Sequence, residues 1–153
     1  MDRNDLILTA QKLTQVSEEH ASEFSSKIEH LVDLMNQKMA ARADILDMVG
    51  VNNLEMMKDN HANHARFLES IFCQHSPEIL VDTVLWVFRA YRSRNFASTY
   101  WAAQLNAWIE IYKKELSPEC FKAVYPYYNW MQINIPNFVK LSDEVLESGH
   151  SAH

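Results

Sequence analysis

Apolar side chains recur every three or four residues along the first third of the chain, which is the spacing of one face of an α-helix. The series begins at Leu6 and ends at Val49, and Gly50 follows it where a helix would stop. An unbroken helix of that length would measure roughly 65 Å, whereas a compact domain of this size has a radius of gyration of about 15 Å. We therefore expect residues 1–49 either to break near residues 17–26 or to project and pack on a partner subunit.

The rest of the chain divides into helices at recognisable start signals. Two Ser-Pro-Glu triplets, at 76–78 and 117–119, each supply an N-cap, a first-turn proline and an acidic residue. Pro126 and Pro136 are expected to kink or divide the last helical region, because proline lacks a backbone N–H and clashes with the preceding turn. The predicted helices cover residues 53–74, 77–94, 97–116 and 118 onward.

No segment shows the alternation of a β-strand, so the predicted fold is all-α with five or six principal helices. Globin-like packing suits the helix count and the short connections better than a plain four-helix bundle, which is the alternative. We expect a single domain over residues 1–147, made of a long helical segment, 1–49, and a globin-like core, 50–147. Residues 148–153 are expected to form a disordered tail.

Composition and charge narrow the functional classes. The 153 residues carry a formal net charge of -6, which disfavours nucleic-acid binding because phosphate neutralisation needs clustered Lys and Arg. With only 2 glycines, the chain lacks the turn residues of a dinucleotide-binding or P-loop fold. Cys73 and Cys120 form no CxxC pair and are interpreted as reduced core residues. The chain has no leader-like N-terminus and no run of ~18 apolar residues, so we expect a cytoplasmic protein without a membrane span.

His61 and His64 share the apolar face of the predicted helix 53–74. Neutral ring nitrogens are good ligands for metals and for haem iron, so the pair suggests a haem- or metal-binding function as an alternative. Two ligands are few for a metal site, and no histidine occurs between His75 and His150, where a haem globin would place its proximal ligand. The simpler interpretation is two core histidines that hydrogen-bond to the backbone or to a neighbouring helix, with no cofactor.

Arg92 falls in the middle of the inner face of the predicted helix 77–94, beside Tyr91 and flanked by Arg89. A core-facing guanidinium is costly unless it is paired, so Arg92 should meet a carboxylate, backbone carbonyls or a bound anion. A side chain this close to the helix end can also reach solvent or the last carbonyls. In the candidate site Arg92 anchors an anionic group of the ligand.

Aromatic residues crowd the second half of the chain. A stripe with Trp101 and Trp108, and with Gln104 at its edge, is typical of core packing, yet such large rings can also leave an apolar pocket with a few polar anchors. Trp86 points away from the inner face of its helix, which suggests a second buried surface and a homodimer contact. The candidate ligand-binding residues are Arg92, Arg89, Tyr91, Trp101, Gln104 and Trp108.

The run 84–94, followed by Tyr100-Trp101 and by Leu105-x-x-Trp108, resembles the helical sensory modules of bacterial signalling proteins. Over the C-terminal two thirds of the chain, helix order and length are similar to those of haem-free globin-like sensors, such as the N-terminal domains of stressosome proteins and the sporulation-inhibitory sensor proteins. The resemblance implies a dimeric domain that senses a small ligand or relays a signal without catalysis. Some of these relatives hold a fatty acid and an anion where haem would lie.

No GxSxG or HExxH motif occurs, and neither cysteine has a recognisable histidine partner, so we expect no enzymatic activity. The sequence predicts a globin-like sensory or regulatory domain that forms a homodimer and binds a small apolar or anionic ligand in an aromatic-lined cavity. One alternative is a haem- or metal-binding gas-sensing or redox protein that uses His61 and His64. Another is an interaction module with a solid core.

Overall fold

The computed structural model describes the backbone of residues 1–151 and the side chains of residues 1–144. The described backbone forms seven α-helices joined by short loops and contains no strand, so the all-α prediction is confirmed. None of the helices within these residues has the length and apolar composition needed to cross a membrane. The helices are α1 (Arg3–Ala10), α2 (Glu18–Ala40), α3 (Ile45–Val49), α4 (Leu54–Cys73), α5 (Pro77–Arg92), α6 (Ser98–Glu115) and α7 (Pro118–Ser151).

The N-terminal segment, expected either to break near residues 17–26 or to project onto a partner, breaks at residues 11–17, just before most of that stretch, and again at residues 41–44, which gives α1, α2 and α3. Ser17 starts α2, because its hydroxyl accepts a hydrogen bond from the backbone N–H of His20 at 3.2 Å. The helix before the break, α1, packs against α5. The Arg3 guanidinium pairs with the Asp82 carboxylate at 2.6 and 2.9 Å. The segment therefore folds back on its own chain.

The helices from α4 to α6 lie where their start and stop signals predict, within one or two residues. The prolines do not divide the last helical region, since α7 runs through both Pro126 and Pro136. The alternative, a kink at either proline, stays a prediction. Each internal proline costs about 3 kcal/mol in a helix. Burial of Tyr127, Tyr128 and Phe138, all 0 % exposed, offsets that cost on the turns next to the prolines.

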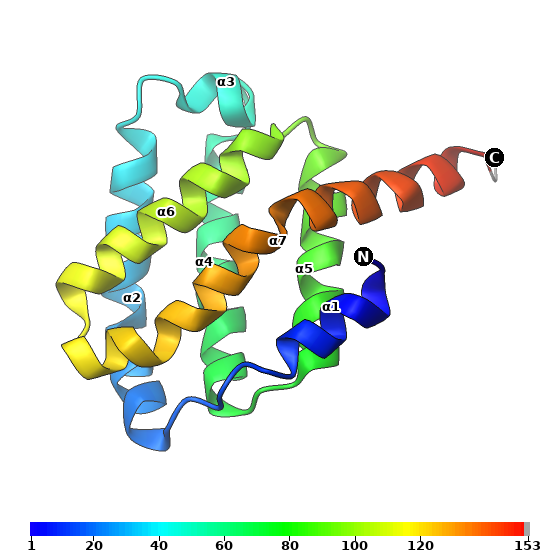
Figure 1. Cartoon of the computed structure of the whole chain (residues 1–153). Helices are drawn as coiled ribbons and strands as arrows, with labels where there is room; N and C mark the ends of the chain where they lie inside the picture. The colour runs from blue at the N-terminus through cyan, green and yellow to red at the C-terminus, as the bar shows by residue number, and fades with distance from the viewer. Residues whose placement is uncertain (152–153) are drawn as a thin grey trace.

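The helices form two layers that cross each other (Figure 1). In one layer α2 packs on α4, and α5 follows beyond α4; in the other, α6 packs on α7. The layers are joined where α6 crosses α2 and where α7 crosses α5. This arrangement brings α4, α5, α6 and α7 together around one region of the interior.

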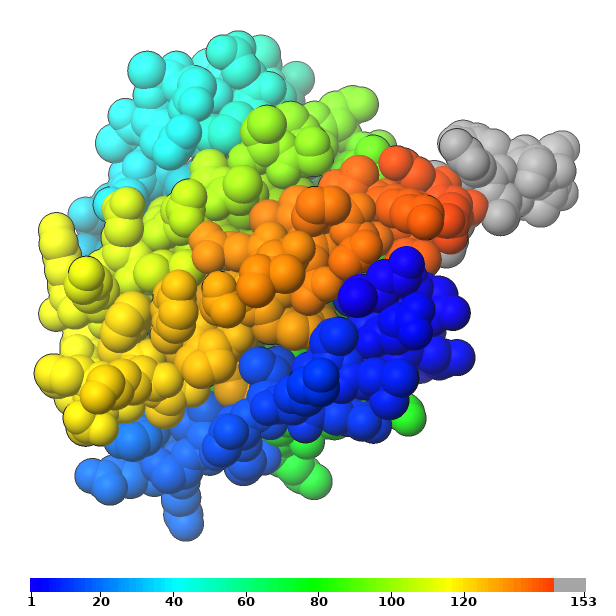
Figure 2. Space-filling model, viewed as in Figure 1, coloured from blue at the N-terminus to red at the C-terminus, as the bar shows by residue number. Residues whose placement is uncertain are grey.

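The N-terminal segment covers part of α7 at the surface. Figure 2 shows α1, in dark blue, lying along the orange part of α7. Two hydrogen bonds join the segments: the Trp130 indole N–H donates to the Thr9 hydroxyl at 2.9 Å, and the Tyr127 hydroxyl donates to the Thr14 carbonyl at 2.8 Å. Because these donors are buried or partly buried, their bonds also avoid an unpaired polar group in the core.

The first turn of α7 is capped by a residue from α2. The Glu23 carboxylate accepts hydrogen bonds from the Ser117 backbone N–H and hydroxyl, both at 2.7 Å, and from Lys27 Nζ at 3.1 Å. Burial raises the pKa of Glu23, but the bonds from Ser117 and Lys27 outweigh it and lower that pKa to about 2. This contact fixes the start of α7 against α2.

The expected disordered tail, residues 148–153, falls on positions whose side chains lie outside the described residues, and it stays a prediction.

Candidate functional site

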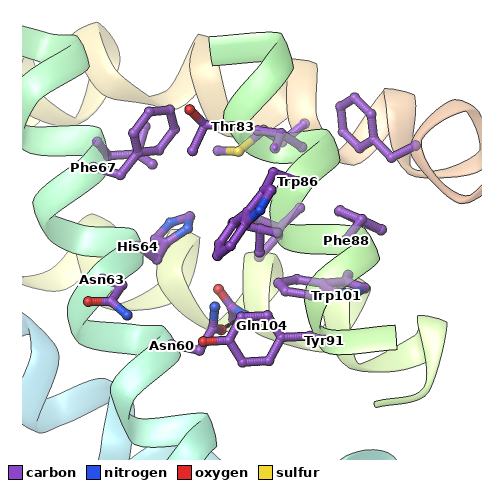
Figure 3. Close-up of a pocket in the computed structure, with 16 residues that line it drawn as sticks. Asn60, Asn63, His64, Phe67, Thr83, Trp86, Phe88, Tyr91, Trp101 and Gln104 are labelled. Atoms are coloured by element: carbon purple, nitrogen blue, oxygen red, sulfur yellow. Dashed lines mark hydrogen bonds between the residues drawn. The ribbon is translucent and has the colours of Figure 1, made fainter. Parts of the chain in front are cut away.

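A cavity of about 210 Å³ lies where α4, α5, α6 and α7 meet. It is lined mainly by aromatic and aliphatic side chains, as Figure 3 shows. The lining residues are Asn60, Asn63, His64, Phe67 and Leu68 from α4; Thr83, Val84, Trp86, Val87, Phe88 and Tyr91 from α5; Trp101, Gln104 and Leu105 from α6; and Met131 and Phe138 from α7.

One wall of the cavity is a stack of rings. Phe88 stacks on Trp101 with ring centroids 4.6 Å apart and an interplanar angle of 26°, and it meets Phe138 at 5.3 Å. Tyr91 packs edge-on against Trp101 at 6.0 Å. Because the rings of Phe88 and Trp101 stack on each other, they do not fill the space between α5 and α4. That space is part of the cavity.

A buried polar network closes one end of the cavity. The Asn60 side-chain oxygen accepts hydrogen bonds from the Tyr100 hydroxyl at 2.9 Å and from Gln104 Nε2 at 2.8 Å. The Gln104 oxygen accepts from the Trp108 indole N–H at 3.2 Å. The Tyr91 hydroxyl is turned toward Asn60 from the α5 side (Figure 3). This end of the cavity therefore presents neutral polar groups.

His61 is part of the same network and lies behind the cavity wall. Its Nδ1 lies 2.7 Å from the Asn36 side-chain oxygen, and its Nε2 lies 3.2 Å from the Tyr100 hydroxyl. Burial lowers the pKa of His61 to about 3, so the ring is neutral at ordinary pH. Both nitrogens already have partners, and His61 is a structural member of the core.

His64 lines the cavity, and side chains outside the cavity fix the position of its ring. Its ring stacks on Trp108 with centroids 5.3 Å apart and an interplanar angle of 17°. Its Nε2 lies 2.7 Å from the Tyr128 hydroxyl, which in turn lies 2.5 Å from the Tyr112 hydroxyl. Burial, with a smaller effect from His61, lowers the pKa of His64 to about 3. A neutral imidazole thus projects into an apolar space.

The two histidines do not converge on one point with other ligating groups. Within the described residues no cluster of three or more His, Cys, Asp or Glu side chains could hold a metal ion. His61 is bonded to Asn36 and Tyr100, and His64 to Tyr128. The geometry favours the expectation of hydrogen-bonded core histidines over a ligand pair.

Arg92 is not among the residues that line the cavity, so its predicted role as the anchor for an anionic group there finds no support in the geometry. Its guanidinium donates to the Val139 carbonyl at 3.1 Å and to the Ser142 hydroxyl at 2.9 Å, and it pairs with the Asp143 carboxylate at 2.5 Å. The carboxylate and carbonyl partners expected from the sequence are therefore present. Arg92 is the last residue of α5, where α7 crosses, and Arg89 also lies outside the lining.

Arg92→Gln is expected to lower the free energy of unfolding by about 1–3 kcal/mol, because it removes charge-assisted hydrogen bonds between α5 and α7. Urea unfolding measures the change. Arg94→Gln is the matched control, since Arg94 is exposed in the turn that follows α5. Equal stability of the two variants would show that the bonds from Arg92 to α7 contribute nothing.

Trp86 occupies the mouth of the cavity. Its indole is 61 % exposed, and in Figure 3 it points across the opening toward His64. Although the sequence predicts that Trp86 lies on a surface away from the inner face of α5, the structure also makes it a lining residue of the cavity. The homodimer contact at Trp86 stays a prediction.

The structure brings together some of the predicted site residues and adds others. Tyr91, Trp101 and Gln104 line the cavity, while Trp108 supports His64 from outside it. Sequence reasoning missed Asn60, although a polar residue beside His61 on an apolar helix face was a usable signal. No protein-family model, no curated protein and no solved structure matches this chain.

Proposed function

We propose that the chain is a non-enzymatic sensory or regulatory domain that binds a small apolar ligand in the cavity among α4, α5, α6 and α7. The cavity itself carries the proposal. At about 210 Å³ it exceeds the engineered apolar cavity of about 150 Å³ that takes up benzene. The cavity opens to the surface beside Trp86, so a small molecule can reach its apolar walls and bury them.

The lining favours an uncharged ligand over an anionic one. None of the sixteen lining residues is Lys, Arg, Asp or Glu, and His64 is neutral. An anion inside such a wall would lose its hydration without gaining a counter-charge. The apolar part of the predicted ligand class is therefore retained, and the anionic part is not.

The globin-like packing, the homodimer, the role in bacterial signalling and the cytoplasmic location belong to the same proposal. The two crossing layers with a cavity between them support globin-like packing. The exposed indole of Trp86 is available for a subunit contact. The absence of catalysis is supported by the polar groups around the cavity, which are neutral and largely bonded to each other.

Native mass spectrometry of freshly purified protein tests the proposal. We expect a dimer that carries a small molecule, which is released on denaturation. Val87→Trp should remove that molecule by filling the cavity, whereas Val51→Trp, at a position 75 % exposed and outside the cavity, should keep it. A dimer that never carries a small molecule and ignores apolar probes would instead favour the interaction module with a solid core.

A further inference from the structure

His64 presents one nitrogen to the cavity in a fixed position. Stacking on Trp108 and the bond from Nε2 to Tyr128 set both the plane and the rotation of the ring. Among residues 1–144, whose side chains are described, Nδ1 has no hydrogen-bond partner, and it is not an enclosed atom. The ring projects toward Trp86 across the cavity (Figure 3). A ligand is therefore offered one directed hydrogen-bonding group.

The two tyrosine hydroxyls that are hydrogen-bonded in series to His64 Nε2 determine whether Nδ1 is a donor or an acceptor toward a ligand. A neutral imidazole has one donor and one acceptor nitrogen, and each tyrosine has a single O–H. If Tyr112 donates to Tyr128, and Tyr128 donates to Nε2, then Nδ1 carries the proton and donates to the ligand. In the reverse direction Nδ1 accepts. A ligand hydroxyl suits both directions, because it can accept and donate.

The hydrogen-bonded series His64, Tyr128 and Tyr112 disfavours a charged ligand. Burial raises the pKa of Tyr112 and of Tyr128, and it lowers that of His64, so all three groups are neutral. The polar end of the cavity is also neutral, since Asn60 and Gln104 are amides. An ionised group on the ligand would have no partner of opposite charge in either place.

Trp86 adds a flat apolar surface at the entrance. It is a lining residue and yet 61 % exposed, and it faces the His64 ring across the opening. A planar ring whose hydroxyl reaches Nδ1 in the plane of the imidazole would contact the indole with one of its faces. Such a contact buries the part of the Trp86 surface that faces the cavity.

We propose that the cavity selects flat, uncharged aromatic molecules that carry one hydroxyl group, which hydrogen-bonds to His64 Nδ1 while Trp86 covers the ring. This proposal rests on the ligand-binding function proposed above and names its ligand class.

Three probes that share one ring system test the selection by titration calorimetry: 2-naphthol, 2-methylnaphthalene and 2-naphthoate. We expect 2-naphthol to bind about tenfold more tightly than 2-methylnaphthalene, the gain from one good hydrogen bond. The anionic 2-naphthoate should bind at least about tenfold more weakly than 2-naphthol, because its charge is unpaired. Equal binding of 2-naphthol and 2-methylnaphthalene, or preferred binding of 2-naphthoate, would overturn the proposal.

Variants assign the effect to the two side chains. His64→Phe keeps a ring against Trp108 and should abolish the preference for 2-naphthol, whereas His30→Phe, at a side chain 60 % exposed, should not. Tyr128→Phe leaves the imidazole in place without its anchor and should reduce the same preference. Trp86→Ala should weaken 2-naphthol and 2-methylnaphthalene about tenfold, and the control Ile133→Ala, at a position 67 % exposed, should weaken neither.

The outcomes separate this inference from the function on which it rests. If 2-methylnaphthalene binds as well as 2-naphthol, the ligand-binding function stands and hydroxyl recognition is wrong. If none of the three probes binds, the aromatic ligand class is wrong. If, in addition, native mass spectrometry finds no bound small molecule, the proposed function fails as well.

Discussion

Trp108→Ala is expected to lower the free energy of unfolding by about 3–5 kcal/mol, a large part of the stability of a domain of this size. The Trp108 side chain is 0 % exposed, stacks on His64 and on Tyr112, and donates its indole N–H to Gln104. Its removal leaves a void and also an unpaired amide oxygen. Urea unfolding followed by circular dichroism measures the loss.

A second tryptophan in the same chain provides the matched control. Trp86→Ala removes the same side chain from a position that is 61 % exposed, so we expect a change of less than about 1 kcal/mol. The comparison isolates burial from the chemistry of the indole. Similar losses in the two variants would show that the ring of Trp108 is not the centre of the core.

Stability is expected to fall steeply as the pH drops from about 6.5 toward 3. Burial lowers the pKa of His61 and of His64 from 6.5 to about 3 in the folded chain. In this window the unfolded chain binds more protons, so acid favours unfolding by up to about 1.4 kcal/mol per pH unit for each histidine. Above pH 6.5 this contribution to stability is fully present. Between pH 7 and pH 5 the two together would cost up to about 4 kcal/mol.

Urea unfolding at pH 7, 6 and 5 measures this dependence. His61→Gln and His64→Gln should each flatten it. Glu23 acts in a lower window, because its pKa is lowered from 4.5 to about 2 and its contribution is lost only as the pH falls through that range. A free energy of unfolding that stays constant from pH 7 to pH 5 would contradict the buried, neutral state of both histidines.

Much of the helical framework could be predicted from local patterns. The starts of α5 and α7 follow from the Ser-Pro-Glu triplets, because a hydroxyl cap and a first-turn proline act within a few residues. The hydrogen-bonded state of His61 and His64 was also the simpler sequence interpretation. It follows from their place on an apolar face, where an unpaired ring nitrogen would be costly.

Other features depend on contacts between distant segments, which no local pattern contains. The helix period continues through residues 11–17, so the pattern indicates a break in this part of the chain without placing it there or showing that α1 packs on α5. Pro126 and Pro136 carry a strong local signal that tertiary burial overrides. The periodicity of α5 correctly predicts that Tyr91 lies on its inner face. The same pattern does not reveal that Arg92, at the end of this helix, contacts α7 outside the cavity.

The cap that Glu23 provides for Ser117 links two segments separated by 94 positions along the chain. Closing so long a loop is slow relative to forming a helix turn, and contacts of this kind set the pace of folding. The two bonds from Ser117 to Glu23 can therefore form only when α2 and the start of α7 have come together, whereas the bond from the Cys120 N–H to the Ser117 hydroxyl is local to the first turn. During synthesis on a ribosome α2 emerges long before α7. The Glu23 carboxylate, which accepts the bonds from Ser117, is therefore already outside the exit tunnel when the last helix leaves it.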